Sequence, residues 1–173
     1  MRKALVIAVV ITLLAALGLT FVLLPNQSND VSMFDTAKNQ TQEETPQEVK
    51  ASFAIFTNGT FRVFTASMYH NLSEEVFIES SNPNIVRVKN SGITWDDFFK
   101  TLPFKLSYSC LTTGTGETFC TNGAQTLKFY INGELAPNAL SQTINQDDKL
   151  LVSFGNESEQ EIKNQIQQIP NTD

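Results

Sequence analysis

Hydrophobic and polar positions divide the chain into three parts. Residues 4–24 form an apolar run without a charge, whereas residues 25–50 are rich in Asn, Gln, Thr and Glu. From Ser52 onward, short apolar runs alternate with turn sequences. The pattern predicts a transmembrane segment at 1–24, a flexible stalk at 25–50, which has too few apolar residues to form a core, and a folded domain at 51–173.

The N-terminal segment has the features of a signal-anchor. At 1.5 Å per residue its apolar run spans roughly 30 Å, the thickness of the hydrocarbon core of a bilayer. Arg2 and Lys3 precede the run, and positive charges stay on the cytoplasmic side. The alternative is a cleaved signal peptide with its small-residue site at residues 16–18. Both readings place the C-terminal domain outside the cytoplasm; the first predicts a single-pass protein of the cell membrane.

The folded part begins with signals for β-hairpins. Asn58-Gly59 separates two apolar runs and favours a tight turn that pairs Phe56 with Phe61 and Phe53 with Phe64. The runs "VFIES" and "IVRVK" flank "SNPN", and "TLKFYINGELA" repeats the Asn-Gly signal. "KLLVSFG" predicts a last strand. The phenylalanines of these strands are expected in the core.

Two short helices are predicted between and after the strands. The first has Thr94 as its N-cap and Pro103 after its end, and the second has Ser158 and Glu161 as a capping box. Their apolar faces repeat at helical spacing: Trp95, Phe98, Phe99 and Leu102 in the first; Ile162, Ile166 and Ile169 in the second. A helix between hairpins predicts an α+β roll in which that helix covers one face of a sheet.

Composition removes several functions. The net charge is −6, which argues against nucleic-acid binding because phosphates require a basic face. His70 is the only histidine and is expected to be an ordinary surface residue, so no metal site or hydrolytic triad is predicted. Asp96 and Asp97 are explained by the first turn of a helix rather than by catalysis. The segment "TGTGETF" lacks the lysine of a phosphate loop. No cofactor is expected.

Cys110 and Cys120 are the only cysteines. Two thiolates do not complete a zinc site, and their spacing is not that of a thioredoxin-like pair. In an exported domain they are expected to form a structural disulfide, worth roughly 3 kcal/mol by loop closure. A redox-active pair and free thiols are the alternatives.

Asn-x-Ser/Thr acceptors also fit an exported protein. They mark possible glycosylation sites, and the one at position 58 occupies a predicted tight turn. The acceptor residues are Asn26, Asn39, Asn58, Asn71 and Asn156.

Four stretches resemble a family of membrane-anchored, exported proteins of archaea and some bacteria. They are "TWDDFFKTL", "CL…ETFC", "LKFYINGE" and "INQDDKLLVSFGNESEQEIKNQI", where members read like "TLGxFF", a Cys pair, "TLKxYVNG" and "DxDRILISYGNESEEEI". The resemblance covers residues 53–169 and is most specific over 127–162. It implies a β-grasp-like fold, and the family has no established biochemical activity.

The chain departs from that family at its histidines. Members often carry histidines in two middle strands, in a pattern like "VHxHxGDGDVIHxHA", and one more before the first strand, which together would suit a metal site. The matching residues here are Lys50, Phe77, Glu79, Arg87 and Lys89. Glu79 is instead expected to form an exposed cross-strand ion pair with Arg87 or Lys89. No metal is therefore predicted.

Three functions follow as hypotheses. The first is a non-enzymatic, membrane-tethered extracellular domain that binds a protein partner or belongs to a complex of the cell envelope. The second is a thiol-disulfide oxidoreductase that uses Cys110 and Cys120. The third is a metal-carrying envelope protein, which the resemblance suggests and the missing histidines disfavour.

Overall fold

The computed structural model describes residues 48–173, so the predicted anchor and almost all of the predicted stalk lie outside the described residues. Among residues 48–173, no helix has the length and apolarity needed to cross a membrane. The elements are β1 (Val49–Thr57), β2 (Thr60–Phe61), η1 (Ser67–Tyr69), β3 (Val76–Glu79), β4 (Asn82–Val88), α2 (Trp95–Thr101), β5 (Lys105–Leu106), β6 (Cys110–Thr112), β7 (Thr118–Cys120), β8 (Thr126–Ile131), β9 (Glu134–Leu135), η2 (Ala139–Ser141), β10 (Lys149–Gly155) and α3 (Glu159–Ile166).

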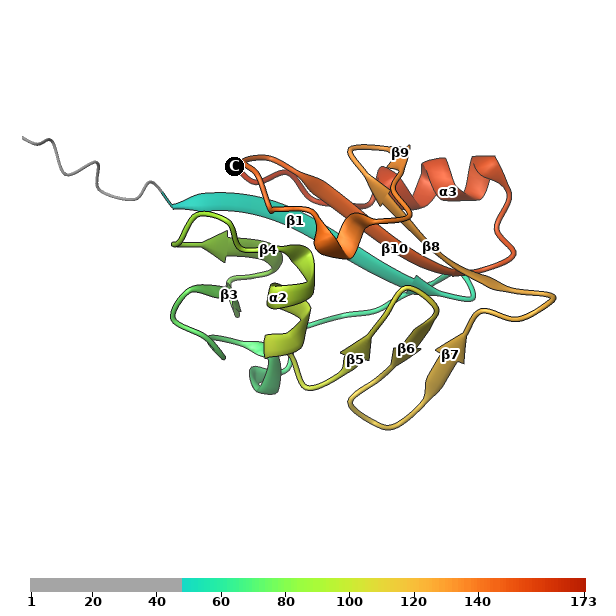
Figure 1. The fold of residues 1–173 in the computed structure, drawn as a ribbon, viewed down its shortest axis with the longest axis horizontal. Helices are drawn as coiled ribbons and strands as arrows, with labels where there is room; N and C mark the ends of the chain where they lie inside the picture. Colours follow the sequence, from blue (N-terminus) through green and yellow to red (C-terminus); the bar gives the residue numbers. More distant parts are fainter. Residues whose placement is uncertain (1–47) are drawn as a thin grey trace, which may run out of the picture. The chain divides into compact units, whose positions relative to one another are not determined.

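The described domain is α+β, as expected, with one large mixed sheet and one small antiparallel sheet. The large sheet has the order β3-β4-β1-β10-β8-β9, with β2 paired to β1. Strands β1 and β10 lie side by side in the middle and run parallel, whereas the other pairs are antiparallel (Figure 1). The small sheet has the order β5-β6-β7.

The central strands are apolar along almost their whole length because both faces of the sheet are covered. In register, Phe53 lies beside Leu150, and Ile55 lies beside Val152. A strand buried on both faces needs a continuous apolar run rather than alternation. The sequences "SFAIF" and "LLVSF" meet this requirement, and the side chains of Ser52 and Ser153 are also fully buried.

One face of the large sheet packs against α2 and the small sheet. Phe53 is at the centre of this core, with ring centroids 5.0 Å from Phe64, 5.3 Å from Phe98 and 5.8 Å from Phe99. The contacts with Phe98 and Phe99 are edge-to-face, a geometry that adds to the free energy gained by burying the rings. Leu111 of the small sheet belongs to the same cluster. The prediction that the first helix covers one face of a sheet is thus confirmed.

The opposite face packs against α3 and the chain that follows it. Phe56 and Leu151 contribute apolar side chains from β1 and β10, and Ile162 and Ile169 cover them. Beside this cluster, the Lys128 Nζ lies 3.1 Å from the Glu157 carboxylate, and the Glu157 side chain is only 7% exposed. The C-terminal helix therefore packs on its own domain.

The turn predictions are confirmed. Asn58-Gly59 and Asn132-Gly133 both have positive φ angles, at 51° and 73° in the first pair and 53° and 87° in the second. These angles suit the tight hairpin turns that Asn-Gly sequences favour. The β3–β4 hairpin also forms at the predicted place.

Two details of the first hairpin differ from expectation. The sheet begins at Val49, where Val49 and Lys50 pair with β4, so the last residues assigned to the stalk belong to β1. Phe56 pairs with Phe61 as predicted, but β2 ends there and Phe64 is not a strand partner of Phe53. The Phe64 ring instead packs against Phe53 within the core. Aromatic burial, rather than ladder pairing, brings these two residues together.

Both predicted capping boxes are present. Thr94 Oγ1 accepts a hydrogen bond from Asp97 N at 3.2 Å, and the Asp97 carboxylate accepts one from Thr94 N at 2.9 Å. Ser158 and Glu161 make the same reciprocal pair at the start of α3. Hydrogen bonds from Thr94 lower the pKa of Asp97, and those from Ser158 lower the pKa of Glu161.

We predict that Thr94→Ala lowers the free energy of unfolding by about 1 kcal/mol at neutral pH, because it removes the N-cap of α2. The lowered pKa of Asp97 means that its carboxylate stabilises the fold above the ordinary value of 3.8 and loses this effect as pH falls. The difference between variant and parent should therefore shrink in acid. Denaturant unfolding of both proteins, at neutral pH and below pH 3.8, measures this difference in the free energy of unfolding.

Lys100→Ala is the matched control, because it removes an exposed ion pair with Asp96 on the same helix and leaves the hydrogen bonds between Thr94 and Asp97 in place. Its effect should be smaller than that of Thr94→Ala. An equal loss of stability in both variants would contradict the role assigned to the capping box.

Candidate functional site

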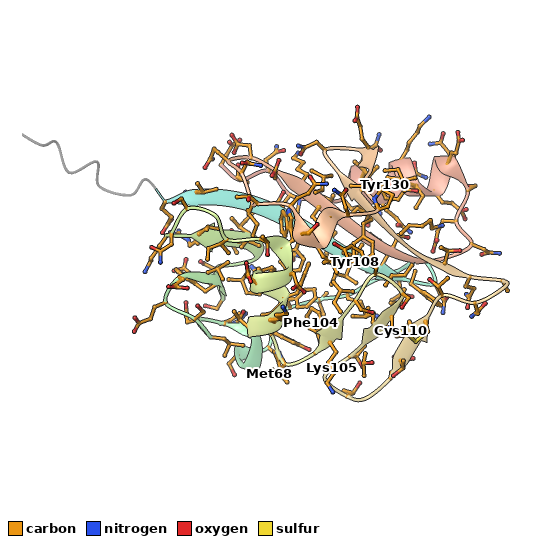
Figure 2. The ribbon with its side chains drawn as sticks, viewed as in Figure 1. Met68, Phe104, Lys105, Tyr108, Cys110 and Tyr130 are labelled. Carbon is orange, nitrogen blue, oxygen red and sulfur yellow. A yellow bond between two sulfur atoms is a disulfide. The ribbon has the colours of Figure 1, made fainter. Side chains whose placement is uncertain are left out.

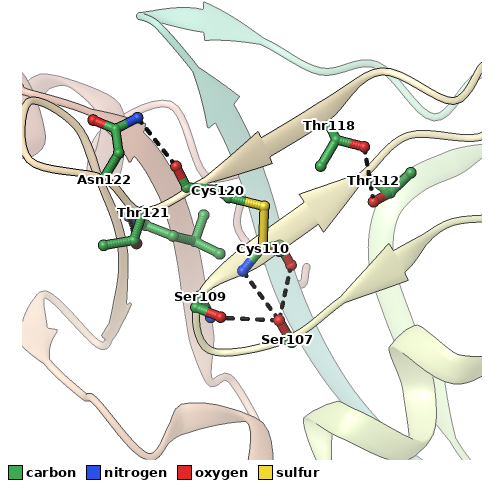
Figure 3. The surroundings of a disulfide bond; sticks show 9 residues. Ser107, Ser109, Cys110, Thr112, Thr118, Cys120, Thr121 and Asn122 are labelled. Atoms are coloured by element: carbon green, nitrogen blue, oxygen red, sulfur yellow. Dashed lines mark hydrogen bonds between the residues drawn. A yellow bond between two sulfur atoms is a disulfide. The ribbon is translucent and has the colours of Figure 1, made fainter.

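Cys110 and Cys120 are joined by a disulfide. The two residues lie directly opposite each other on β6 and β7, with their Cα atoms 4.1 Å apart, within the separation that a disulfide requires. Figure 3 shows the bond across the two strands. At the next register position but one, the hydroxyls of Thr112 and Thr118 lie 3.2 Å apart. The hairpin is thus fastened by a covalent bond and a side-chain pair.

The residues that form hydrogen bonds beside the disulfide are uncharged. Ser107 Oγ accepts hydrogen bonds from Cys110 N at 3.0 Å and from Ser109 N at 3.4 Å, and Asn122 Nδ2 donates to Cys120 O (Figure 3). No described helix begins at either cysteine. A reactive thiolate requires a cation or a helix N-terminus to lower its pKa. The neighbourhood therefore favours the structural role, which stays a prediction.

A cleft of about 260 Å³ lies beside this hairpin. Its walls are the chain from Thr60 to Phe64 and the hairpin tip from Thr113 to Thr115, and Phe104, marked in Figure 2, contributes an aromatic ring. The lining is Ile55, Thr60, Phe61, Arg62, Val63, Phe64, Tyr69, Phe104, Leu111, Thr113, Gly114 and Thr115. We call it the aromatic cleft.

Arg62 ties the two walls of the aromatic cleft together. Its Nε donates a hydrogen bond to Thr57 Oγ1 at 2.5 Å, and its Nη2 lies 3.4 Å from the Glu117 carboxylate. Its guanidinium also stands 5.0 Å from the centre of the Phe119 ring. The one charged residue of the lining is thus neutralised by a neighbour, which leaves the cleft without an uncompensated charge.

The tip of the β6–β7 hairpin sits close against the chain around α2 and η1. A Cβ at Gly114 would lie 2.9 Å from Pro103 O and 3.6 Å from Met68 Cε. Real Cβ atoms rarely come this near to a carbonyl oxygen, so glycine allows the close approach. The hairpin is thus held at its tip by packing against Pro103 and at its other end by the disulfide.

The five residues that match the family histidines do gather on one side of β1, β3 and β4. Lys50 and Phe77 both pair with Arg87 in register. Arg87 Nε lies 3.0 Å from the Glu79 carboxylate, which confirms the predicted ion pair, and Lys89 Nζ stands 5.0 Å from the Phe77 ring centre. The Glu79–Arg87 pair is half-buried rather than exposed.

In this cluster the positive charge of Arg87 is compensated by carboxylates. A second carboxylate, that of Glu48, lies 2.6 Å from Arg87 Nη1. Among residues 48–173, no group of three or more His, Cys, Asp and Glu side chains is placed to hold a metal ion. The arrangement has the chemistry of a cross-strand ion-pair network.

His70 belongs neither to the disulfide hairpin nor to the ion pairs of Arg87. It is half-buried at the end of η1, and its Nε2 lies 2.8 Å from Phe64 O. The imidazole thus contacts the chain that forms one wall of the aromatic cleft. It is less exposed than the surface position predicted from the sequence.

Three of the five predicted glycosylation acceptors fall within the described residues. Asn58, Asn71 and Asn156 are all exposed, and the first two have positive φ angles, of 51° and 54°. Asn26 and Asn39 lie outside the described residues. Attachment of a glycan stays a prediction at every site.

The aromatic cleft was not predicted from the sequence. Phe61 and Phe64 were assigned to the core, and Tyr69 and Phe104 carried no motif. The lining comes from segments about 50 residues apart, and the signal present in the sequence is only the density of aromatic residues between 53 and 69. Comparisons with protein-family models, curated proteins and solved structures gave no significant match.

We predict that replacing both cysteines by serine lowers the free energy of unfolding by roughly 3 kcal/mol, because the unfolded chain regains the entropy of an open loop. Thermal and denaturant unfolding of the two proteins measure the loss. The same loss should follow from full chemical reduction of the parent.

The redox alternative makes the opposite prediction. A bridge with a reduction potential above about −230 mV, together with insulin-reductase activity, would contradict the structural role. The double serine variant is the blank for that assay.

Proposed function

We propose that this protein is a non-enzymatic, membrane-tethered domain outside the cytoplasm that binds a protein partner of the cell envelope through its aromatic cleft. The observation that carries the proposal is the cleft itself. Aromatic walls with a few polar groups are typical of binding sites, and the disulfide holds one wall in place. In this proposal the disulfide supports one wall of the binding site and takes part in no reaction.

The strand order supports a β-grasp-like reading of the fold. The first strand of the domain and the last are parallel neighbours, antiparallel strands flank both, and α2 packs across one face. Connecting segments tolerate variation better than the strands that they join. Here the connection between β4 and β8 contains α2, the small sheet and one wall of the aromatic cleft.

The absence of assembled catalytic groups among residues 48–173 is consistent with a binding role. The only histidine contacts a backbone carbonyl, and Asp96 and Asp97 lie in the first turn of α2, where Asp97 completes a capping box. The arginines at the cleft and on β4 are each paired with carboxylates. These groups serve the fold, so we infer no catalytic role.

The tether in this proposal is the N-terminal segment of residues 1–24, a signal-anchor that remains attached to the mature protein. One prediction of this proposal is that the N-terminal segment is not cleaved. Because a spanning helix is held by its apolar length, the protein should stay in native membranes after an alkaline carbonate wash. Immunoblotting and intact-mass measurement should find the chain with its N-terminal segment. A shortened species released by the wash would contradict the anchor and indicate a cleaved signal peptide.

The second prediction concerns the cleft. We expect the full chain carrying Thr115→p-benzoylphenylalanine, reconstituted in vesicles and mixed with solubilised native membranes, to cross-link one discrete protein on irradiation. Thr115 lines the cleft and is exposed, so a photoreactive group there reaches a bound partner. Gel analysis and mass spectrometry identify the adduct.

Gln160→p-benzoylphenylalanine is the matched control, because Gln160 is exposed on α3 and does not line the cleft. The variant at position 160 should not form this adduct. An excess of parent protein without the photoreactive group should reduce the amount of adduct formed by the variant at position 115. The same adducts at both positions would contradict binding through the cleft.

A further inference from the structure

We propose that the partner binds as an extended, apolar peptide strand that adds to the free edge of residues 60–65, which we call the edge segment. This inference rests on the proposed function and specifies the chemistry of the ligand. Strand addition supplies affinity through main-chain hydrogen bonds and specificity through pockets for alternate side chains. The edge segment has both parts.

The aromatic cleft runs along the backbone of the edge segment. Side chains of an extended chain alternate between two faces, so a pocket on one face is lined by every second residue. Here five consecutive residues, from Thr60 to Phe64, line the cleft. Three consecutive residues of the hairpin tip, from Thr113 to Thr115, line the other side. The cleft is therefore a groove between two stretches of backbone, which is the shape of an extended chain.

The backbone of the edge segment has unused hydrogen-bonding groups. Arg62 N donates to Ile55 O at 2.8 Å, so this residue turns its N–H toward β1. Alternation along an extended chain then turns the N–H of Val63 away from β1. In the described part of the chain, neither backbone group of Val63 makes a hydrogen bond, and its side chain is 64% exposed. A second strand beside Val63 would satisfy these groups.

The lining selects an uncharged, apolar strand. Phe64, Tyr69 and Phe104 present aromatic rings, with threonine hydroxyls at the opposite wall. The positive charge of Arg62 already faces the Glu117 carboxylate at 3.4 Å and the Phe119 ring. A charged peptide side chain would lose its hydration in this groove without gaining a free counter-charge.

The other edges of the large sheet are less suitable. At β3, the Asn71 N–H already donates to Ile78 O at 3.0 Å, so the neighbouring chain occupies part of that edge. Strand β9 is as short as β2, but the pocket beside it contains no aromatic residue and is lined mainly by polar side chains. Short or covered edges are how sheet proteins avoid unwanted pairing. The edge segment therefore remains as the place where an extended ligand fits.

A separate peptide suits the groove better than a second copy of this chain. The hairpin tip stands across from the edge segment, so the edge is reached from within a groove. Two folded domains would each need to present an edge to the other, and the tip of each stands in the way. A single peptide strand has no hairpin tip of its own to bring past this one.

The experiment selects short random peptides displayed on phage against the full chain in lipid nanodiscs. We expect selected peptides to carry apolar residues at alternate positions. Fluorescence anisotropy of one selected peptide then gives its affinity. N-methylation of alternate backbone amides in one register should weaken binding about tenfold, because each removed donor leaves an acceptor unpaired. Methylation in the other register, which faces away from the edge segment, should have little effect.

Protein variants test the same contact from the other side. Val63→Pro removes the proposed donor and should weaken binding about tenfold, whereas the control Val63→Thr keeps the N–H and should bind like the parent. Tyr69→Ala removes one aromatic ring from the cleft and should also reduce binding. Thermal unfolding confirms that each variant is folded, and the methylated peptides test the proposal even if Val63→Pro is unstable.

Three outcomes overturn strand addition. The first is binding that is insensitive to both methylation registers and to Val63→Pro. The second is dimerisation of the full chain through the cleft, seen as loss of peptide binding with rising protein concentration, which makes the occupant a second copy. The third is failure to select any peptide while position 115 still cross-links a partner; the proposed function then stands and the peptide chemistry fails. If cross-linking fails as well, both are overturned.

Discussion

The parallel pairing of β1 with β10 is the constraint on which the rest of the domain depends. A parallel pair needs a long crossover, because its two strands enter from the same end of the sheet. Here the crossover contains every other described element except α3 and the chain after it. Six paired positions, from Ser52 with Lys149 to Thr57 with Phe154, fix the register and with it the positions of both flanking sets of strands.

The two faces of that central pair are covered by different parts of the chain. One face buries Phe53 and Ile55 beneath α2 and the small sheet, and the chain between β2 and α2 contributes Phe64 and Tyr69 to the same side. The other face is closed by α3 and by Ile169 beyond it. The crossover adds only partly buried side chains to this second face, those of Phe61 and Tyr130. Most of the aromatic cleft, in contrast, is formed by the crossover.

The aromatic cleft joins the proposals on function. The disulfide links two strands of only three residues each, and so short a hairpin buries little apolar surface of its own. A covalent bond at one end and the close contact of Gly114 with Pro103 at the other hold the tip opposite the edge segment. We therefore interpret the disulfide as support for a binding groove, and the exposed Val63 as the place where an extended partner adds to the sheet.

Local chemistry determined much of this structure before any tertiary contact. The Asn-Gly turns, the capping boxes at Thr94 and Ser158, and the placement of the two cysteines across a hairpin all follow from interactions within a few residues. The Glu79–Arg87 pair follows from the alternation of two strands joined by a short turn. The cleft does not follow from such rules. Phe64 leaves the strand ladder because burial against Phe53 and Phe104 outweighs further pairing with β1. Only the packing of distant segments decided where Phe64, Tyr69 and Thr115 lie relative to one another. Hydrophobic contact has no preferred direction, so it leaves no characteristic residue spacing in the sequence.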